Sequence, residues 1–182
     1  SAAAQAAAPP TACPSLQSLV DDAVPGATIS VPPCLYRETP VIGKPLTLEA
    51  QPGAEIRGSD VWSAFVARED GTWESVERVP VFHAKEAGDC ATRVDGPCRG
   101  LSSVYRDGVA LARVGERAAP GPDEFVVTPS RSIVLGADPE GHLIEVVTRQ
   151  HWVRVRASDV TLAGFRMRHA VSHDDVGAID VD

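Results

Sequence analysis

Residues 25–62, PGATISVPPCLYRETPVIGKPLTLEAQPGAEIRGSDVW, form a series of short apolar segments that are interrupted every few positions by Pro or Gly. The segments carry two or three β-forming residues at alternate positions, which is typical of strands with one buried face. They lie at residues 28–31, 40–42, 46–50 and 54–57, and the Pro and Gly residues between them favour tight turns. One circuit of such strands cannot bury its own apolar face and needs another circuit stacked against it. The stretch therefore predicts a coil of stacked parallel strands.

The regions on either side predict a short helix before the coil and a different kind of sheet after it. Residues 14–23 place apolar side chains at helical spacing behind Ser15, a candidate N-cap, and the pattern stops at a Pro-Gly pair. We expect this helix to cover the apolar end of the coil, because exposed sheet ends invite association. From about residue 63, apolar runs joined by turns such as RDG at residues 106–108 predict antiparallel hairpins.

The coil pattern returns near Trp152, where the sequence VRVRASDVTLAGFRMRHA again alternates apolar and polar residues. The phrase DVTLAGFRMRHA loosely repeats PLTLEAQPGAEIRG of the first stretch, as successive coils of a solenoid do. The alternation is still running at Asp182, so we expect further coils or a partner chain to cover this end. We expect four divisions. Residues 1–12 are a disordered start, residues 13–62 a cap helix with the first coil, residues 63–150 an inserted β-domain, and residues 151–182 the resumed coils.

Charge and motifs exclude several classes of partner. The 182-residue chain has a formal net charge of −8, which argues against nucleic acid or an anionic membrane surface as its partner. No apolar run in the sequence approaches the length of a membrane span. The glycine-rich motifs of nucleotide-binding proteins and the nucleophile-elbow motif of hydrolases do not occur in the sequence.

Four cysteines, Cys13, Cys34, Cys90 and Cys98, lack the C-x-x-C spacing that is typical of zinc sites. We predict the disulfides Cys13–Cys34 and Cys90–Cys98, with four buried free thiols as the alternative. Disulfides are typical of proteins outside the cytosol. The start SAAAQAAAPP is typical of a mature N-terminus after cleavage of a signal peptide. These features together predict a secreted, extracellular protein.

The phrases GATISVPPCLYRE and KPLTLEAQPGAEIRGSDVW resemble the N-terminal coil of secreted right-handed parallel β-helix proteins of the pectate-lyase-like superfamily. The usual pattern of that family is PGDTI-x-V-x-x-G-x-Y-RE followed by KPLTL, and Cys34 stands where Gly is common. The segment VYRDGVALARV is similar to the start of a small β-domain inserted after the first coil in bacterial members. The resemblance covers about residues 14–182. It implies an all-β fold, a right-handed parallel β-helix with a short N-terminal cap helix and an inserted small antiparallel β-domain, and polysaccharides bound along its groove.

In the family that the chain resembles, catalytic groups lie on middle coils, so the last stretch of this sequence holds the candidates. Asp180 and Asp182 are two positions apart on a predicted strand, so both carboxylates share its outer face, while Ile179 and Val181 face inward. Such a pair suits glycoside hydrolysis and is also a candidate site for Ca²⁺, the one cofactor considered; solvated surface carboxylates are the alternative. His173 lies beside further carboxylates and is a candidate general base, with plain turn formation as the alternative.

Four arginines on the resumed coils are expected to stack into one basic stripe: Arg154, Arg156, Arg166 and Arg168. A stripe of this kind would bind the carboxylates of a uronate polymer in a bidentate manner, while an ordinary charged outer face is the alternative. The predicted substrate contacts are Arg166, Arg168, His169 and Asp175, with a plain surface histidine as the alternative for His169.

The sequence thus predicts the N-terminal part of a secreted carbohydrate-active β-helix protein, a polysaccharide lyase or glycoside hydrolase with catalytic coils at or beyond its C-terminal end. The expected partner is a polysaccharide or an oligosaccharide. Trp62, Trp73 and Trp152 flank the insert and either stack on sugars or seal the insert against the coil. The alternative function is a non-catalytic secreted β-helix for surface or carbohydrate binding, with a second polypeptide completing the coil.

Overall fold

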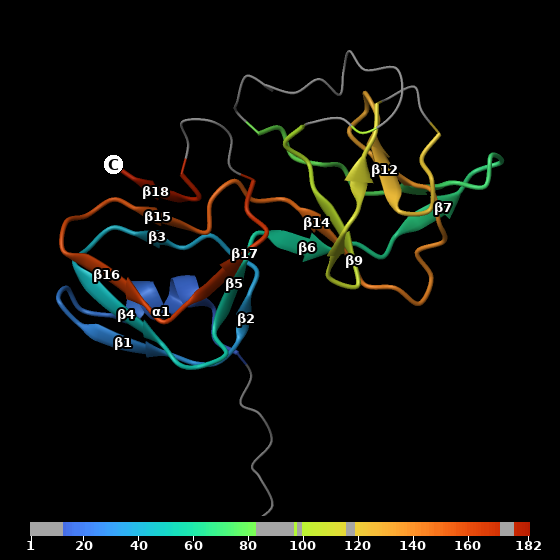
Figure 1. Cartoon of the computed structure of the whole chain (residues 1–182). Coiled ribbons are helices and arrows are strands. Elements are labelled where there is room, and N and C mark those ends of the chain that lie inside the picture. Colours follow the sequence, from blue (N-terminus) through green and yellow to red (C-terminus); the bar gives the residue numbers. More distant parts are fainter. Residues whose placement is uncertain (1–12, 83–96, 98–99, 116–118, 172–176) are drawn as a thin grey trace, which may run out of the picture.

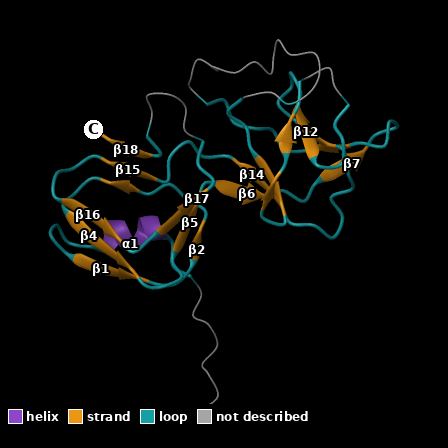
Figure 2. Cartoon of the chain, in the orientation of Figure 1, coloured by secondary structure: helices purple, strands orange, loops and turns teal. Residues whose placement is uncertain are grey.

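The computed structural model describes residues 13–82, 97, 100–115, 119–171 and 177–182, and this part of the chain contains one helix and eighteen short strands (Figures 1 and 2). The all-β class expected from the sequence is therefore confirmed. The predicted disordered start and the predicted Cys90–Cys98 bridge lie outside the described residues. No helix in the described part is long and apolar enough to cross a membrane.

Nine strands make three successive passes, and each pass contributes one strand to each of three parallel sheets, ordered β1-β4-β16, β2-β5-β17 and β3-β15-β18. The first pass consists of β1 (Thr28–Val31), β2 (Leu35–Tyr36) and β3 (Val41–Ile42). The second consists of β4 (Leu46–Ala50), β5 (Glu55–Arg57) and β15 (Val153–Val155), and the third of β16 (Val160–Ala163), β17 (Arg166–Arg168) and β18 (Ile179–Val181). The sequence pattern did not predict β2.

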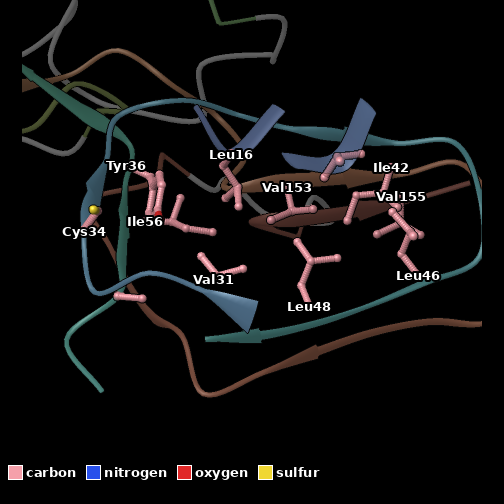
Figure 3. Packing of buried hydrophobic residues seen from close by; sticks show 12 residues of the cluster. Leu16, Val31, Cys34, Tyr36, Ile42, Leu46, Leu48, Ile56, Val153 and Val155 are labelled. Atoms are coloured by element: carbon pink, nitrogen blue, oxygen red, sulfur yellow. The ribbon is translucent and has the colours of Figure 1, made fainter. Parts of the chain in front are cut away.

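The apolar side chains that alternate along these strands meet in a shared core (Figure 3). Val31, Ile56 and Ile42 come from the three different sheets, and each is fully buried. Leu16 and Val20 of α1 (Leu16–Asp22) enter the same core, and α1 packs near β3 of the first pass. Burial of an aliphatic side chain contributes about 1.5–3 kcal/mol, so the alternation of apolar residues selects this arrangement over one with the faces reversed.

The start of α1 is held to the first pass by hydrogen bonds. Ser15 is the N-cap, as predicted, and its side chain accepts from the Ser18 N–H. The carboxylate of Glu38 accepts from the backbone N–H groups of Leu16 at 2.7 Å and Gln17 at 3.1 Å. A carboxylate at this position satisfies donors that the helix leaves free and complements its dipole.

The third pass leaves part of its apolar surface uncovered. Ile179 and Val181 pair in register with Val153 and Val155, so they point the same way as those buried side chains. They are nevertheless 38% and 67% exposed, because no described segment lies over them. The register therefore agrees with the inward direction predicted for Ile179 and Val181, but these two side chains are not buried.

Between β5 and β15 the chain forms two further sheets in which most strand pairs are antiparallel (Figure 1). The sheet β10-β9-β14-β6 consists of β6 (Ser59–Val61), β9 (Val104–Arg106), β10 (Val109–Ala110) and β14 (Ile144–Val147). The sheet β11-β12-β13-β8-β7 consists of β7 (Phe65–Ala67), β8 (Trp73–Ser75), β11 (Ala112–Arg113), β12 (Glu124–Val127) and β13 (Ile133–Leu135). These strands have a core of their own around Trp62, Phe125 and Ile133. The change to antiparallel pairing falls before β6.

Cys13 and Cys34 form the predicted disulfide, with their Cα atoms 6.0 Å apart. The bond joins the segment before α1 to the start of β2, and Cys34 belongs to the core of the parallel sheets. The two cysteines are separated by 21 positions, and a cross-link of about this span stabilises a fold by roughly 3 kcal/mol, mainly by restricting the unfolded chain.

Candidate functional site

A buried carboxylate, Glu145, lies where the inserted strands meet the parallel sheets. It is 1% exposed on β14, a strand whose other residues are apolar. An unpaired buried charge is costly, so it requires partners. Arg37 Nη2 lies 2.7 Å from its Oε1, and Arg57 Nη1 lies 2.9 Å from the same oxygen. Both arginines belong to the first two passes, so the ion pairs fasten the insert to the parallel sheets.

A histidine adjoins this ion cluster. The fully buried Ser59 hydroxyl lies 3.2 Å from Glu145 Oε1 and 3.0 Å from His169 Nδ1. The imidazole of His169 stacks on the ring of Tyr105, with centroids 3.7 Å apart and an interplanar angle of 12°. We call these residues, together with Arg37 and Arg57, the junction cluster.

The backbone at His169 is held in an uncommon conformation. Its φ is 58°, a left-handed value that is uncommon outside Gly, although Asn, Asp and His adopt it more often than other residues. Gly58 lies against it, and a Cβ added there would come 2.3 Å from the His169 carbonyl oxygen. Strained backbone of this kind persists only where the surroundings enforce it, and it occurs often at functional sites.

The electrostatics of the junction cluster assign protonation states at neutral pH. Burial raises the pKa of Glu145, but the hydrogen bonds from Arg57 and Arg37 outweigh it and hold the pKa below its ordinary value. Burial lowers the pKa of His169, and the opposing charge of Glu145 does not restore it. Burial also raises the pKa of Tyr105. The cluster therefore holds an ionised Glu145, a neutral imidazole and a protonated phenol.

These states define what His169 can do. When the Ser59 hydroxyl donates to the Glu145 carboxylate, its oxygen accepts from His169 Nδ1–H, and the lone pair of the imidazole is then on Nε2. A neutral imidazole in this tautomer accepts a hydrogen bond or a proton from a hydroxyl group. His169 was predicted to contact substrate, and its half-buried side chain is compatible with that role.

Asp180 of β18 and Asp182, which directly follows that strand, both reach Arg156. Asp180 Oδ2 is 2.6 Å from Arg156 Nη2, and Asp182 Oδ2 is 3.4 Å from Arg156 Nε. The hydrogen bond from Arg156 holds the pKa of Asp180 below its ordinary value, so this carboxyl is ionised and unsuited to act as an acid at neutral pH. The catalytic role of the pair stays a prediction, and His173 and Asp175 lie outside the described residues.

The single basic stripe expected from the four arginines is wrong. Arg154 and Arg156 lie on β15, while Arg166 and Arg168 lie on β17, and these strands belong to different sheets. The sequence shows the alternation along each strand but not which sheet each strand joins. The first pair faces Asp180 and Asp182, and Arg166 Nη1 lies 4.0 Å from Glu55 Oε2.

Arg166, one of the predicted substrate contacts, lines a cavity on the parallel sheets. The cavity has a volume of about 270 Å³, and Glu55 and Phe165 also line it. Arg168 is exposed, and its backbone oxygen accepts from the indole N–H of Trp152 at 2.8 Å. Trp152 also packs against the core of the parallel sheets, and the sealing role considered for it stays a prediction.

Sequence reasoning missed Glu145, Arg37, Arg57, Ser59 and Tyr105. One signal was present, because Glu145 is the only charged residue in the run LIEVV, and a charge inside a buried strand requires partners. The sequence could not show which residues those partners are, because Arg37 is 108 positions and Arg57 is 88 positions from Glu145 along the chain.

The side chains that commonly hold metal ions in proteins are those of His, Cys, Asp and Glu. Among the described residues, no group of three or more of these side chains is arranged to hold a metal ion. The predicted Ca²⁺ site at Asp180 and Asp182 stays a prediction, and Arg156 competes there for the same oxygens.

Comparison with known proteins gives a likeness in fold. No family model matches the sequence, and no curated protein matches it significantly. A solved structure described as the complex structure of XylC with xylose is similar, with a TM-score of 0.64 over 87% of this chain. The sequence identity is 20%, and the chain spans about a third (32%) of the length of that protein. At this identity the likeness shows a shared fold.

Proposed function

We propose that the chain belongs to a secreted, carbohydrate-active right-handed parallel β-helix protein, with catalytic coils at or beyond residue 182. The likeness in fold to XylC, which was solved with xylose, carries this proposal. Three parallel sheets built over three successive passes support the β-helix, and crossovers between parallel strands of one sheet are almost always right-handed. The Cys13–Cys34 disulfide supports secretion. The predicted second polypeptide gains no support from the structure or the comparisons.

Within this proposal, glycoside hydrolysis or saccharide binding fits the charges better than uronate cleavage. A lyase that acts on a uronate polymer has to neutralise the substrate carboxylates, and free arginines are suited to that task. Here the arginines are divided between two sheets, and Arg154, Arg156 and Arg166 face carboxylates of this chain. In this proposal the ionised Asp180 acts as a base or nucleophile with Asp182 beside it, and His169 Nε2 accepts from a sugar hydroxyl.

The test is a binding and cleavage assay on the intact chain with two sets of oligosaccharides, neutral xylo-oligosaccharides and oligogalacturonates. Calorimetry measures binding, new reducing ends report hydrolysis, and the ultraviolet absorbance of an unsaturated product reports elimination. We expect binding of the neutral set. A folded chain that binds neither set contradicts the proposal.

A matched pair of variants tests the part of His169. His169→Asn removes the imidazole and keeps a residue that tolerates the left-handed backbone, and we expect weaker saccharide binding. Asp159→Asn is the control, because Asp159 has a φ of 56° and is exposed at another corner of the parallel sheets. If the two variants bind the saccharide with equal affinity, His169 is not part of the binding site.

A further inference from the structure

The inserted sheets contain a cavity that is separate from the junction cluster. It has a volume of about 350 Å³, within the range of small-molecule sites. Aromatic side chains and the turn between β13 and β14 supply most of its lining: Trp62, Phe65, Trp73, Asp138, Glu140 and His142.

The aromatic wall of this cavity is built on paired strands. Trp73 pairs with Ala67 across β7 and β8, and Phe65 is two positions from Ala67, so both rings lie on one face of the sheet. Both rings are half-buried and pack against the core that contains Trp62. Their positions are therefore held by packing, while part of each ring remains open to the cavity.

The polar rim of the cavity is also held in place. Asp107, in the turn between β9 and β10, accepts from the Leu143 N–H at 2.9 Å and lies 2.6 Å from His142 Nδ1. Asp138 Oδ1 accepts from the Glu140 N–H at 2.9 Å. A rim with these contacts is formed before any ligand arrives, which reduces the entropy lost on binding.

We propose that this cavity binds one neutral pyranose unit of the saccharide, as a second contact point on the insert. The step rests on the carbohydrate function proposed above. The C–H face of a pyranose is apolar and packs on aromatic rings, and its hydroxyl groups donate hydrogen bonds to carboxylates. Trp73 and Phe65 supply the apolar contact, and Asp138 and Glu140 supply the acceptors.

The charge of the rim selects against uronates. No described Lys or Arg forms an ion pair with Asp138 or Glu140, and both residues are exposed at the rim. Two uncompensated carboxylates repel a third carboxylate on the ligand, whereas they attract the hydroxyl groups of a neutral sugar. The cavity is therefore specific for neutral units.

The experiment compares the affinity of the intact chain for xylohexaose and for a galacturonate hexamer, by calorimetry and tryptophan fluorescence. We expect Trp73→Ala to weaken xylohexaose binding about tenfold, the size of one aromatic contact, and Trp73→Phe to retain most of it. Val66→Ala is the matched control, because Val66 lies next to Phe65 on the opposite face of β7 and is exposed. The double variant Asp138→Asn, Glu140→Gln alters only exposed rim side chains and is expected to reduce discrimination against the uronate.

The possible results separate this inference from the proposed function. If the chain binds xylohexaose and Trp73→Ala, folded by circular dichroism, binds as tightly as Val66→Ala, the saccharide lies elsewhere and only the cavity proposal fails. Tighter binding of the uronate than of xylohexaose overturns the selectivity. If Trp73→Ala does not fold, the double variant decides. The proposal is then overturned if that variant discriminates between xylohexaose and the galacturonate hexamer as strongly as the unmodified chain does. Absence of saccharide binding by the intact chain overturns both the cavity and the function.

Discussion

Replacing Glu145 with Gln tests whether the junction cluster holds the insert to the parallel sheets. The side chain keeps its shape but loses the charge that accepts from Arg37, Arg57 and Ser59. Removing one partner of a buried ion pair costs about 3–5 kcal/mol. The arginine side chains are 21% and 16% exposed, so water replaces part of the loss, and we expect a decrease of about 3 kcal/mol in the free energy of unfolding at neutral pH.

The pH dependence of this stability difference follows from the direction in which the pKa of Glu145 is shifted. The pKa of Glu145 in the folded protein lies below the ordinary 4.5, so its contribution is fully present above that ordinary value and is lost as the pH falls through the folded value. The difference between the native protein and Glu145→Gln is therefore expected to be largest at neutral pH and to shrink in acid. Urea unfolding followed by tryptophan fluorescence, repeated across this pH range, measures both effects.

A surface ion pair provides the control for this experiment. Asp123 pairs with Arg106, but its side chain is 83% exposed, and exposed pairs contribute about 0–1 kcal/mol. We expect Asp123→Asn to change the free energy of unfolding by no more than that. If Glu145→Gln destabilises the protein no more than Asp123→Asn, the junction cluster does not carry the energy assigned to it.

Three further changes have expected outcomes. Replacing Cys13 and Cys34 together with Ser should lower the free energy of unfolding by about 3 kcal/mol, and a reductant should then have no further effect through this bond; an unchanged urea midpoint would contradict this. Leu16→Ala should cost about 2–5 kcal/mol, because the side chain is fully buried in the parallel core, and thermal unfolding measures it. Arg156→Gln should move the pKa of Asp180 up toward its ordinary value, since Arg156 is the main cause of its lowering; an unmoved carboxyl titration by NMR would show that the pair does not form.

The alternation of apolar residues predicted β1 and β4 and the faces that they bury. Residues 28–31 and 46–50 appear as β1 and β4 with the same bounds, because the period of two is a property of each strand alone. The cap helix was predictable for a similar reason, since Ser15 and the apolar spacing behind it act within one turn of chain. The Cys13–Cys34 bond was predicted from the grouping of the four cysteines into two pairs, with free thiols as the alternative, and the structure confirms this bond.

The candidate sites depended on which distant strands meet. Alternation placed Arg154 and Arg166 on outer faces but could not show that β15 and β17 belong to different sheets. Glu145 was visible as a charge in an apolar run, whereas its pairing with Arg37 across 108 positions comes from the docking of the insert. Sequence alone determined the local periods, turns and caps of this protein, because they depend on neighbouring residues. Only the tertiary structure decided the junction cluster and the aromatic cavity, because contacts between distant strands depend on how the whole chain packs.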